Sequence, residues 1–281
     1  MKKLFCILLA LFLLLIVVSC KQDPKSSNLP MGNGETVKVV ILSGQSNASG
    51  CSRAKYLSNK RNYDNVFVNL HEHTNGRRTN GFVSVIPDYG CDGGFFGPEY
   101  GMANLFSTTY PSEKVMIIKY TRGGGSLQEQ FLPSAEDVYP CLVSFVQSSL
   151  ETLRNLNYNP EIVGFCWMQG ESDAVVSEEM ANAYHDNMVT FVTALRNDIQ
   201  SDLKIFDAAI NDIELWVRPD VVNNAKRQLA SELSGYCFID TNAAGLTTVH
   251  EPEPVADLAH YDSRSEIKLG LLFAQAVIDS L

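Results

Sequence analysis

Five short runs of apolar, mostly branched residues are spaced along the chain after residue 36. Each run is continuous rather than alternating, which is the pattern of a strand that is buried on both faces of a sheet. We therefore predict buried strands at residues 37–42, 115–120, 162–167, 204–210 and 236–239.

The segments between these runs carry apolar residues at helical spacing. They predict helices over residues 142–156, 184–199 and 263–281, and Ser263 and Glu266 stand at capping-box spacing at the start of the last one. Alternating strands and helices favour an α/β fold with a parallel sheet covered on both faces, and sites in such sheets form at the carboxyl ends of the strands. Residues 48–97 show weak periodicity, so we expect loops over the site there.

The first twenty residues have the pattern of an export signal. Lys2 and Lys3 precede an apolar run over residues 4–18, and small residues stand before Cys20, which resembles a bacterial lipobox. A plain signal peptide or an anchor helix is the alternative interpretation. We predict a signal over 1–20 with lipidation at Cys20, a flexible polar tether over 21–36 and one domain over 37–281. The chain is then an exported lipoprotein on the periplasmic or cell-surface face of a membrane.

Composition limits the classes of partner. The chain is 45% hydrophobic, which suffices for one buried core, and its formal charge of −10 is spread without acidic blocks. No basic stretch is dense enough to follow a phosphate backbone, so nucleic acid is excluded as a predicted partner. A neutral or weakly charged substrate fits this chain better, and the lipid anchor is its only predicted membrane contact.

Beyond Cys6 and Cys20, five cysteines remain, an odd number for an oxidising compartment. Cys166 and Cys237 lie in apolar strand-like runs and are predicted to be buried thiols. Cys51 and Cys91 lie in loop-like sequence, and they are the predicted pair if one disulfide exists.

A serine nucleophile is indicated by two segments at opposite ends of the chain. Ser46 follows the first strand in a glycine-containing turn, where a hydroxyl can meet a substrate. Asp257 and His260 stand just before the last helix, and a serine nucleophile needs such a base and an acid to orient it. Each segment alone also fits an ordinary turn or helix cap. The α/β-hydrolase elbow G-x-S-x-G is not matched, because Ala48 occupies its last position.

Two more polar turns follow the next strands. Residues 122–126 are rich in glycine and can aim a backbone N–H at an oxyanion, since glycine permits a close approach of the substrate. Residues 167–173 bring an amide donor and two carboxylates to the same rim.

These blocks resemble, in order, those of the carbohydrate acetyl esterases of the SGNH-hydrolase superfamily, the group of sialate O-acetylesterases and acetylxylan esterases. The resemblance rests on residues 44–47, 96–101, 123–127, 167–173 and 257–260. It implies a flavodoxin-like three-layer α/β/α sandwich with a five-stranded parallel sheet. It also implies a triad of Ser46, His260 and Asp257, with Glu171 as a rival acid. The implied oxyanion hole comprises the N–H groups of Ser46 and Gly124 and the side chain of Gln169.

The implied activity is hydrolysis of O-acetyl esters on a carbohydrate through an acetyl-enzyme intermediate, without a cofactor. His71 and His73 have metal-like spacing but lack a third ligand, so no metal is predicted. A silent carbohydrate-binding lipoprotein and a lipase or thioesterase on the same fold are the alternatives. The sugar, the acetyl position and the oligomeric state stay open.

Overall fold

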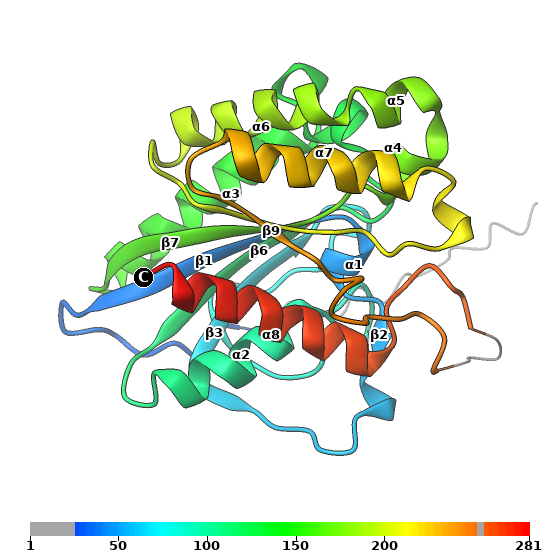
Figure 1. Ribbon diagram of the computed structural model, residues 1–281. Helices are drawn as coiled ribbons and strands as arrows, with labels where there is room; N and C mark the ends of the chain where they lie inside the picture. Colours follow the sequence, from blue (N-terminus) through cyan, green and yellow to red (C-terminus); the bar gives the residue numbers. More distant parts are fainter. Residues whose placement is uncertain (1–25, 252–255) are drawn as a thin grey trace, which may run out of the picture.

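All five predicted strands form, and they lie in one sheet (Figure 1). The computed structural model describes residues 26–251 and 256–281. Within these ranges the predicted strands correspond to β1 (Thr36–Gly44), β6 (Val115–Thr121), β7 (Asn159–Met168), β8 (Ile205–Ala208) and β9 (Tyr236–Ile239).

The sheet has seven strands in the order β4-β3-β6-β1-β7-β8-β9. Its neighbours pair in parallel, except that β4 (Val83–Val85) runs antiparallel to β3 (Tyr63–Glu72). The five predicted strands alone follow the order second, first, third, fourth, fifth, which is the flavodoxin-like arrangement. The predicted α/β fold class is confirmed, whereas the predicted number of five strands is too low.

The two additional strands fall in residues 48–97, which we predicted as loops. The apolar run of β3 is interrupted by Asn65 and Asn69, and that interruption hid the strand in the sequence. Both amides find partners in the folded chain: Asn65 Nδ2 donates to the Tyr110 carbonyl at 3.1 Å, and Asn69 Nδ2 donates to Ser149 Oγ at 2.9 Å. Buried polar groups are tolerated when such hydrogen bonds exist, and these partners lie about 45 and 80 residues away along the chain.

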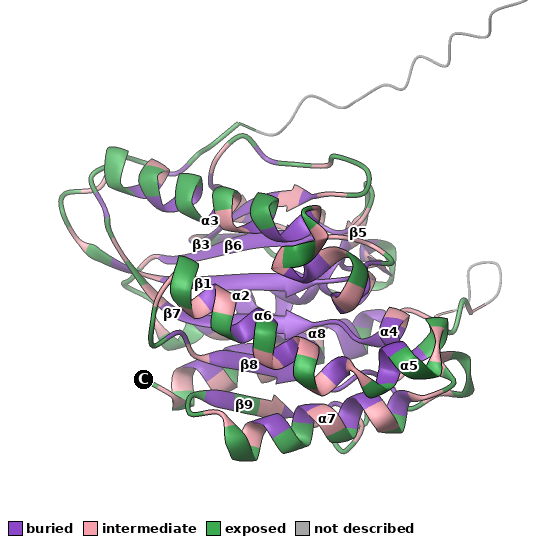
Figure 2. Cartoon of the chain, turned by 90° about the horizontal axis from the view of Figure 1, so that it is seen from above, coloured by how far each residue is buried: buried purple, intermediate pink, exposed green. Residues whose placement is uncertain are grey.

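Helices cover both faces of the sheet, and their inward faces are buried while their outward faces are exposed (Figure 2). One face carries α2 (Pro98–Thr109) and α8 (Ser263–Asp279). The other carries α3 (Val138–Asn155), α6 (Tyr184–Asp198) and α7 (Pro219–Glu232). The three predicted helices are confirmed, and α2 and α7 are additions.

The remaining elements are short. They are α1 (Ser46–Ser49), β2 (Ser52–Arg53), η1 (Ala54–Tyr56), β5 (Phe95–Phe96), the π-helical turn η2 (Leu127–Phe131), η3 (Pro133–Ala135), α4 (Glu171–Val176), α5 (Glu178–Asn182) and η4 (Glu214–Trp216).

The start of α8 differs from the prediction. Asp262, not Ser263, is its N-cap, and the carboxylate accepts the N–H groups of Arg264 and Ser265 at 3.1 and 3.0 Å. A carboxylate that takes two N–H groups also offsets the positive end of the helix dipole. The Ser263 hydroxyl instead donates to the Arg53 carbonyl and to Glu251. Glu266 lies in the first turn of α8 with a fully buried side chain, and it does not close a capping box with Ser263.

Two further expectations are corrected at the margins of the domain. Cys237 is exposed, because β9 is an edge strand with a neighbour on one side only. Part of the predicted tether contacts the domain: Ser27 N–H donates to the Asn80 carbonyl at 2.9 Å, and Leu29 is buried. Cys20 and the signal lie outside the described residues.

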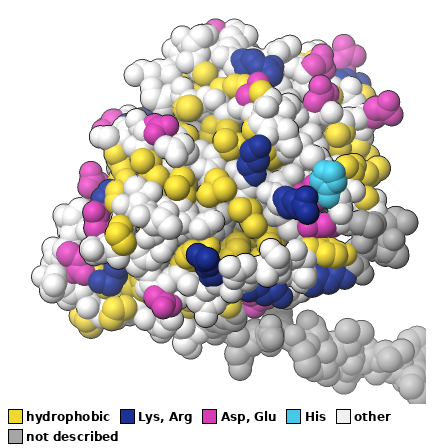
Figure 3. Space-filling view, turned by 60° about the horizontal axis from the view of Figure 1, so that its bottom comes forward, with side chains coloured by type: hydrophobic (Ala, Val, Ile, Leu, Met, Phe, Trp, Pro, Cys, Tyr) yellow, Lys and Arg dark blue, Asp and Glu magenta, His cyan; other side chains and the backbone are white. Residues whose placement is uncertain are grey.

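One face of the molecule carries side chains of both charges. On the face near α2 and α8, Lys and Arg side chains are spread among acidic, apolar and uncharged ones (Figure 3). Within residues 26–251 and 256–281, no helix is both long enough and apolar enough to cross a membrane.

Helices α2 and α8 touch through glycine. A Cβ on Gly101 would lie 2.2 Å from the Ile267 carbonyl oxygen, and one on Gly270 would lie 2.1 Å from that of Pro98. The two backbones therefore pack without an intervening side chain at this crossing.

We expect Gly270→Ala to lower the free energy of unfolding by about 1–3 kcal/mol, because the added methyl group forces the two helices apart. Gly93→Ala is the control, since a Cβ there meets nothing within 4 Å. Urea denaturation of both variants measures the difference. Equal stability of the two variants would show that the helices can separate at no cost.

Candidate active site

The turns that follow β1, β6 and β7 meet at one edge of the sheet, because these three strands are parallel neighbours. The Gly44 carbonyl accepts the N–H of Arg122 at 3.0 Å, which joins the first turn to the second. Gln45 Oε1 accepts the N–H of Ser172 at 3.2 Å, which joins the first turn to the third. This edge brings Gly124 and Gln169 to the turn that contains Ser46, although they follow it in the sequence by roughly 80 and 125 residues.

The Ser46 turn depends on a glycine. Gly44 has φ +140°, and a Cβ there would lie 1.9 Å from the Met168 carbonyl oxygen. Only glycine allows the first strand to end so close to β7. Ser46 itself is half-buried at the start of α1, and its N–H has no acceptor among the described residues.

The glycine turn after β6 is held from two sides. Glu72 Oε1 accepts the Gly123 N–H at 3.0 Å, and the Gly125 carbonyl accepts Gln169 Nε2 at 3.1 Å. Between them Gly124 is exposed, with φ +65°, and its N–H also finds no acceptor in the part of the chain that the structure describes. Two backbone donors, at Ser46 and at Gly124, are thus left for a ligand.

Gln169 is placed differently from the predicted oxyanion donor. Its side chain is fully buried, and its amide nitrogen donates to Asp173 Oδ2 at 2.5 Å as well as to Gly125. Both amide hydrogens are therefore engaged, and direct donation to an oxyanion requires the amide to leave one of these acceptors. In this structure the Gln169 amide supports the glycine turn.

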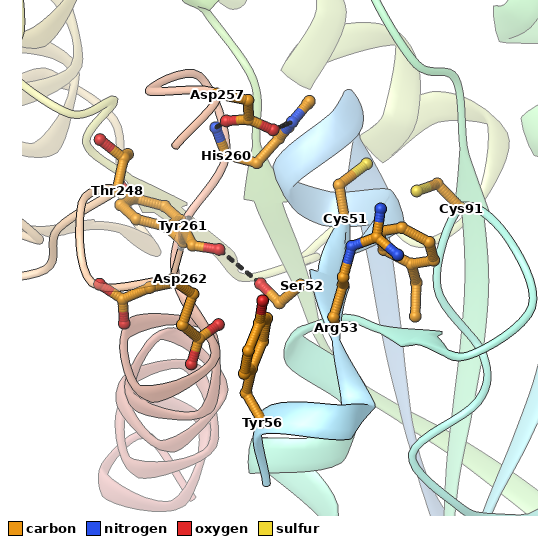
Figure 4. A pocket seen from close by; sticks show the side chains of 12 residues that line it. Cys51, Ser52, Arg53, Tyr56, Cys91, Thr248, Asp257, His260, Tyr261 and Asp262 are labelled. Atoms are coloured by element: carbon orange, nitrogen blue, oxygen red, sulfur yellow. Dashed lines mark hydrogen bonds and ion pairs between the residues drawn. The ribbon is translucent and has the colours of Figure 1, made fainter. Parts of the chain in front are cut away.

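Asp257 and His260 form a hydrogen-bonded pair in the loop before α8 (Figure 4). Asp257 Oδ2 lies 2.8 Å from His260 Nδ1. The other carboxylate oxygen accepts the N–H groups of Ala259 and His260 at 2.9 Å each, so the loop is folded around this carboxylate. Nδ1 is thereby occupied, and Nε2 is the nitrogen that can face a hydroxyl. The Ser46 hydroxyl and the His260 ring are not hydrogen-bonded to each other in the described part of the chain.

Asn47 joins the serine turn to the histidine loop. Its Oδ1 accepts the N–H of Tyr261 at 3.1 Å, and its Nδ2 donates to the Ala259 carbonyl at 3.4 Å. These two residues flank His260 on either side. Because Asn47 also directly follows Ser46, one buried amide fixes where the imidazole stands relative to the hydroxyl.

Glu171 lies behind this amide rather than against the imidazole. Glu171 Oε1 accepts Asn47 Nδ2 at 2.7 Å, and its second oxygen has no partner among the described residues. The side chain is fully buried, and burial raises its pKa despite the hydrogen bond from Asn47. Of the two candidate acids, Glu171 therefore orients Asn47, and only Asp257 touches the histidine ring.

The two carboxyl groups have opposite electrostatic environments. Partial burial acts to raise the pKa of Asp257, but hydrogen bonds from the backbone and ring of His260 outweigh it, and the pKa lies below its ordinary value. The raised pKa of Glu171 favours its neutral form. Such separation of two neighbouring carboxyl groups is a common way to give them different roles.

A cavity of about 270 Å³ opens beside His260 (Figure 4). Its wall includes His260 and Asp257, the thiols of Cys51 and Cys91, and Arg53. The Arg53 guanidinium stacks over the Phe95 ring, 4.7 Å from its centroid. The space next to the histidine is therefore polar and aromatic.

A buried lysine under the Ser46 turn was missed in the sequence. Lys119 Nζ donates to the carbonyls of Ser49 and Tyr89 at 2.9 Å each and to Glu99 Oε2 at 2.5 Å. Both charged side chains have no exposed surface. The available signal was a single lysine inside an apolar strand run, since lysine is rarely buried unless it is paired.

His71 and His73 have separate partners. The His71 ring packs against Tyr120, with centroids 5.2 Å apart, and burial lowers its pKa. His73 Nδ1 lies 2.7 Å from Tyr120 Oη, and its Nε2 lies 3.3 Å from Asp137. Over residues 26–251 and 256–281, no three His, Cys, Asp or Glu side chains are arranged to hold a metal ion.

The sequence profile of one family, described as carbohydrate esterase, sialic acid-specific acetylesterase, matches residues 36–279. The chain belongs to this family. The matched residues include all the turns described above, from the one that contains Ser46 to the loop that contains His260. It identifies the protein as an SGNH-type esterase of the carbohydrate acetylesterase group. A sequence comparison with curated proteins finds no match.

Solved structures share the fold. A protein from Arabidopsis thaliana is 21% identical over 87% of this chain and 98% of its own, with a TM-score of 0.64. NanS is 16% identical over 89% of this chain and 98% of its own, also with a TM-score of 0.64. A carbohydrate acetylesterase from Xanthomonas citri is 11% identical over 85% and 55%, with a TM-score of 0.52. At these identities the similarity establishes the architecture.

We expect Asn47→Ala to lower the free energy of unfolding by about 1–3 kcal/mol, because it leaves the buried N–H of Tyr261 without an acceptor. Amide hydrogen exchange at Tyr261 should accelerate at the same time. Asn224→Ala is the control, since within residues 26–251 and 256–281 this exposed amide bonds only to Arg227, and its loss should change stability by about 0.5 kcal/mol or less. Unchanged exchange at Tyr261 in Asn47→Ala would contradict the bridging role.

Proposed function

We propose that the protein is a serine esterase that removes O-acetyl groups from a carbohydrate. The observation that carries the proposal is the Asp257–His260 hydrogen bond, together with the hydrogen bonds of Asn47, the residue after Ser46, to the backbone on both sides of His260. Family membership supports carbohydrate deacetylation as the general activity.

The proposed reaction proceeds by acyl transfer in two steps. Ser46 attacks the acetyl carbonyl while His260 Nε2 takes its proton, and Asp257 stabilises the imidazolium that forms. The N–H groups of Ser46 and Gly124 stabilise the oxyanion. His260 returns the proton to the leaving sugar hydroxyl, and a water molecule then releases acetate from the serine. No cofactor enters this scheme.

The cavity beside His260 favours a carbohydrate over a long acyl chain. Arg53, Glu251 and Asp262 lie on its wall, so an alkyl chain would meet charged side chains there rather than an apolar tunnel. Aromatic rings and hydrogen-bonding groups of this kind suit the faces and hydroxyls of a sugar. A lipase or thioesterase is therefore the less favoured function.

We also propose that the chain is exported and lipid-anchored at Cys20, on the strength of the apolar run and the small residues before that cysteine.

Ser46→Ala should abolish acetate release while leaving the melting temperature unchanged, because the hydroxyl is the group that forms the acetyl-enzyme. The loss should reach several orders of magnitude in kcat. Released acetate is measured on p-nitrophenyl acetate and on a panel of acetylated xylans, oligosaccharides and sialic acids. Near-normal turnover by folded Ser46→Ala, or a wild type that binds these glycans without hydrolysing them, would refute the proposal.

Asp257→Asn should lower kcat by about 10⁴, since the orienting acid would no longer stabilise the imidazolium. Glu171→Gln should retain clearly more activity, because the glutamine carbonyl oxygen can still accept the Asn47 amide. Kinetics are compared on variants whose melting temperatures match that of the parent. An active Asp257→Asn beside an inactive Glu171→Gln would transfer the acid role to Glu171.

The anchor gives a separate expectation. The native protein should partition into the detergent phase with the membrane fraction, and Cys20→Ala should block maturation or release the protein. Phase separation followed by mass spectrometry of the N-terminal peptide measures this. A soluble wild type without acyl groups would rule out the anchor without affecting the esterase proposal.

A further inference from the structure

Cys51 and Cys91 face each other on the wall of the cavity beside His260 (Figure 4). They are about 40 residues apart in the sequence and come from different loops, directly after Gly50 and Gly90. Both side chains are half-buried, and both thiols are free in this structure. The cavity gives a small reagent access to them.

The backbone fixes this proximity. The Gly50 carbonyl accepts the N–H of Cys91 at 2.8 Å, and a Cβ on Gly90 would lie 2.2 Å from that carbonyl oxygen. A Cβ on Gly50 would lie 2.1 Å from Gly97 Cα. The backbone segments at Gly50, Gly90 and Gly97 are therefore in direct contact. Because Cys51 and Cys91 directly follow two of these glycines, they have little freedom to separate.

The other described cysteines have no such partner. Cys141 is exposed on α3, whereas Cys166 is completely buried in β7. Cys166 and Cys237 pair with the same residue of β8 from opposite sides, so two strand spacings, about 9–10 Å, separate their backbones, which is too far for a disulfide.

We propose that Cys51 and Cys91 form a dithiol modification site, in which Cys91 reacts first with disulfide reagents and Cys51 then closes an intramolecular disulfide. The site lies outside the proposed esterase chemistry, and it joins the loop of the nucleophile turn to the loop that precedes β5.

The environments of the two thiols support this order. The hydrogen bond with Cys51 lowers the pKa of Cys91, and the charge of Lys119 lowers it further. The same hydrogen bond and burial raise the pKa of Cys51. The thiolate is the attacking species in disulfide exchange, so the sulfur that ionises more readily attacks first.

The exchange balances with a disulfide as the oxidant. The Cys91 thiolate attacks one sulfur of the reagent, which forms a mixed disulfide and releases one reagent thiolate. Cys51 then loses its proton and attacks the Cys91 sulfur, which breaks the mixed disulfide and releases the second reagent thiolate. Two protein thiols lose two electrons in total, and the reagent disulfide becomes two thiols that carry the protons.

Closure of this bond has a structural consequence. It encloses residues 51–91, which contain β3 and β4, the two strands at one edge of the sheet. A crosslink restricts the unfolded chain, so the oxidised form should melt roughly 5–10 °C higher than the reduced form. It also links the end of the Ser46 turn to the loop that precedes β5.

The test uses the full chain in detergent, reduced, desalted and then exposed to oxidised glutathione. After thiol blocking and tryptic digestion without reductant, the peptide ending at Arg53 should be linked to the peptide beginning at Thr79. Cys51→Ser should instead retain glutathione on Cys91, because the mixed disulfide cannot be resolved. Cys91→Ser should take up markedly less glutathione on Cys51. The rise in melting temperature should disappear in both variants and on reduction of the wild type.

Cys141→Ser is the matched control, since it removes an exposed thiol on α3 that does not line the cavity and should leave the linked peptide and the melting shift intact. Labelling of Cys141 in the wild type shows that the reagent reacted. A labelled Cys141 without the Cys51–Cys91 peptide would overturn the proposal. Equal glutathione uptake by Cys51→Ser and Cys91→Ser would overturn the assigned order.

Discussion

The buried amide of Asn47 is the contact on which the site depends. It has one oxygen and two hydrogens to satisfy away from water, and its partners are the backbone on both sides of His260 and the carboxyl group of Glu171. Any movement of the histidine loop breaks at least one of these bonds in a buried place, where an unpaired polar group is costly. The first turn and the last loop of the domain are therefore held as one unit, although more than 200 residues separate them.

Charged groups beneath the same edge hold the other turns. Lys119 binds the carbonyl at the end of the Ser46 turn, and Lys226 binds the Gln169 carbonyl at 2.7 Å. Each lysine is fully buried and paired, Lys119 with Glu99 and Lys226 with Asp207. Buried ion pairs are weak sources of stability because desolvation offsets their attraction. Here their directional bonds fix the carbonyl oxygens of Ser49 and Gln169, and through them the turns that follow β1 and β7.

The two carboxyl groups near the histidine illustrate how environment separates similar side chains. Asp257 lies in an exposed loop and takes three hydrogen bonds from the backbone and ring that follow it. Glu171 has a single hydrogen bond and no solvent. The first arrangement suits an ionised acid that supports a charged imidazole, and the second suits a neutral group that orients an amide. The motif that contains Glu171 thus serves the site from behind it.

The sequence by itself determined the strands that are buried on both faces, because continuous apolar runs have few other uses in a domain of this length. It also determined the pairing of Asp257 with His260, since three residues in a tight loop leave the carboxylate within reach of Nδ1. The turns with Ser46 and Gly124 followed from their places after strands, as parallel strands present their carboxyl ends at one edge.

Only the tertiary structure decided the rest. Strand β3 was hidden because Asn65 and Asn69 are satisfied by α3 and the end of α2, which no local pattern reveals. The hydrogen bonds of the Gln169 amide to Asp173 and Gly125 were likewise hidden, because its acceptors lie on two different turns. Asp262 replaced Ser263 as the helix cap because its carboxylate accepts the N–H groups of Arg264 and Ser265, whereas the Ser263 hydroxyl donates to Glu251. Hydrogen-bond partners across the fold are set by the distances between side chains in space, and these distances exist only after the chain has folded.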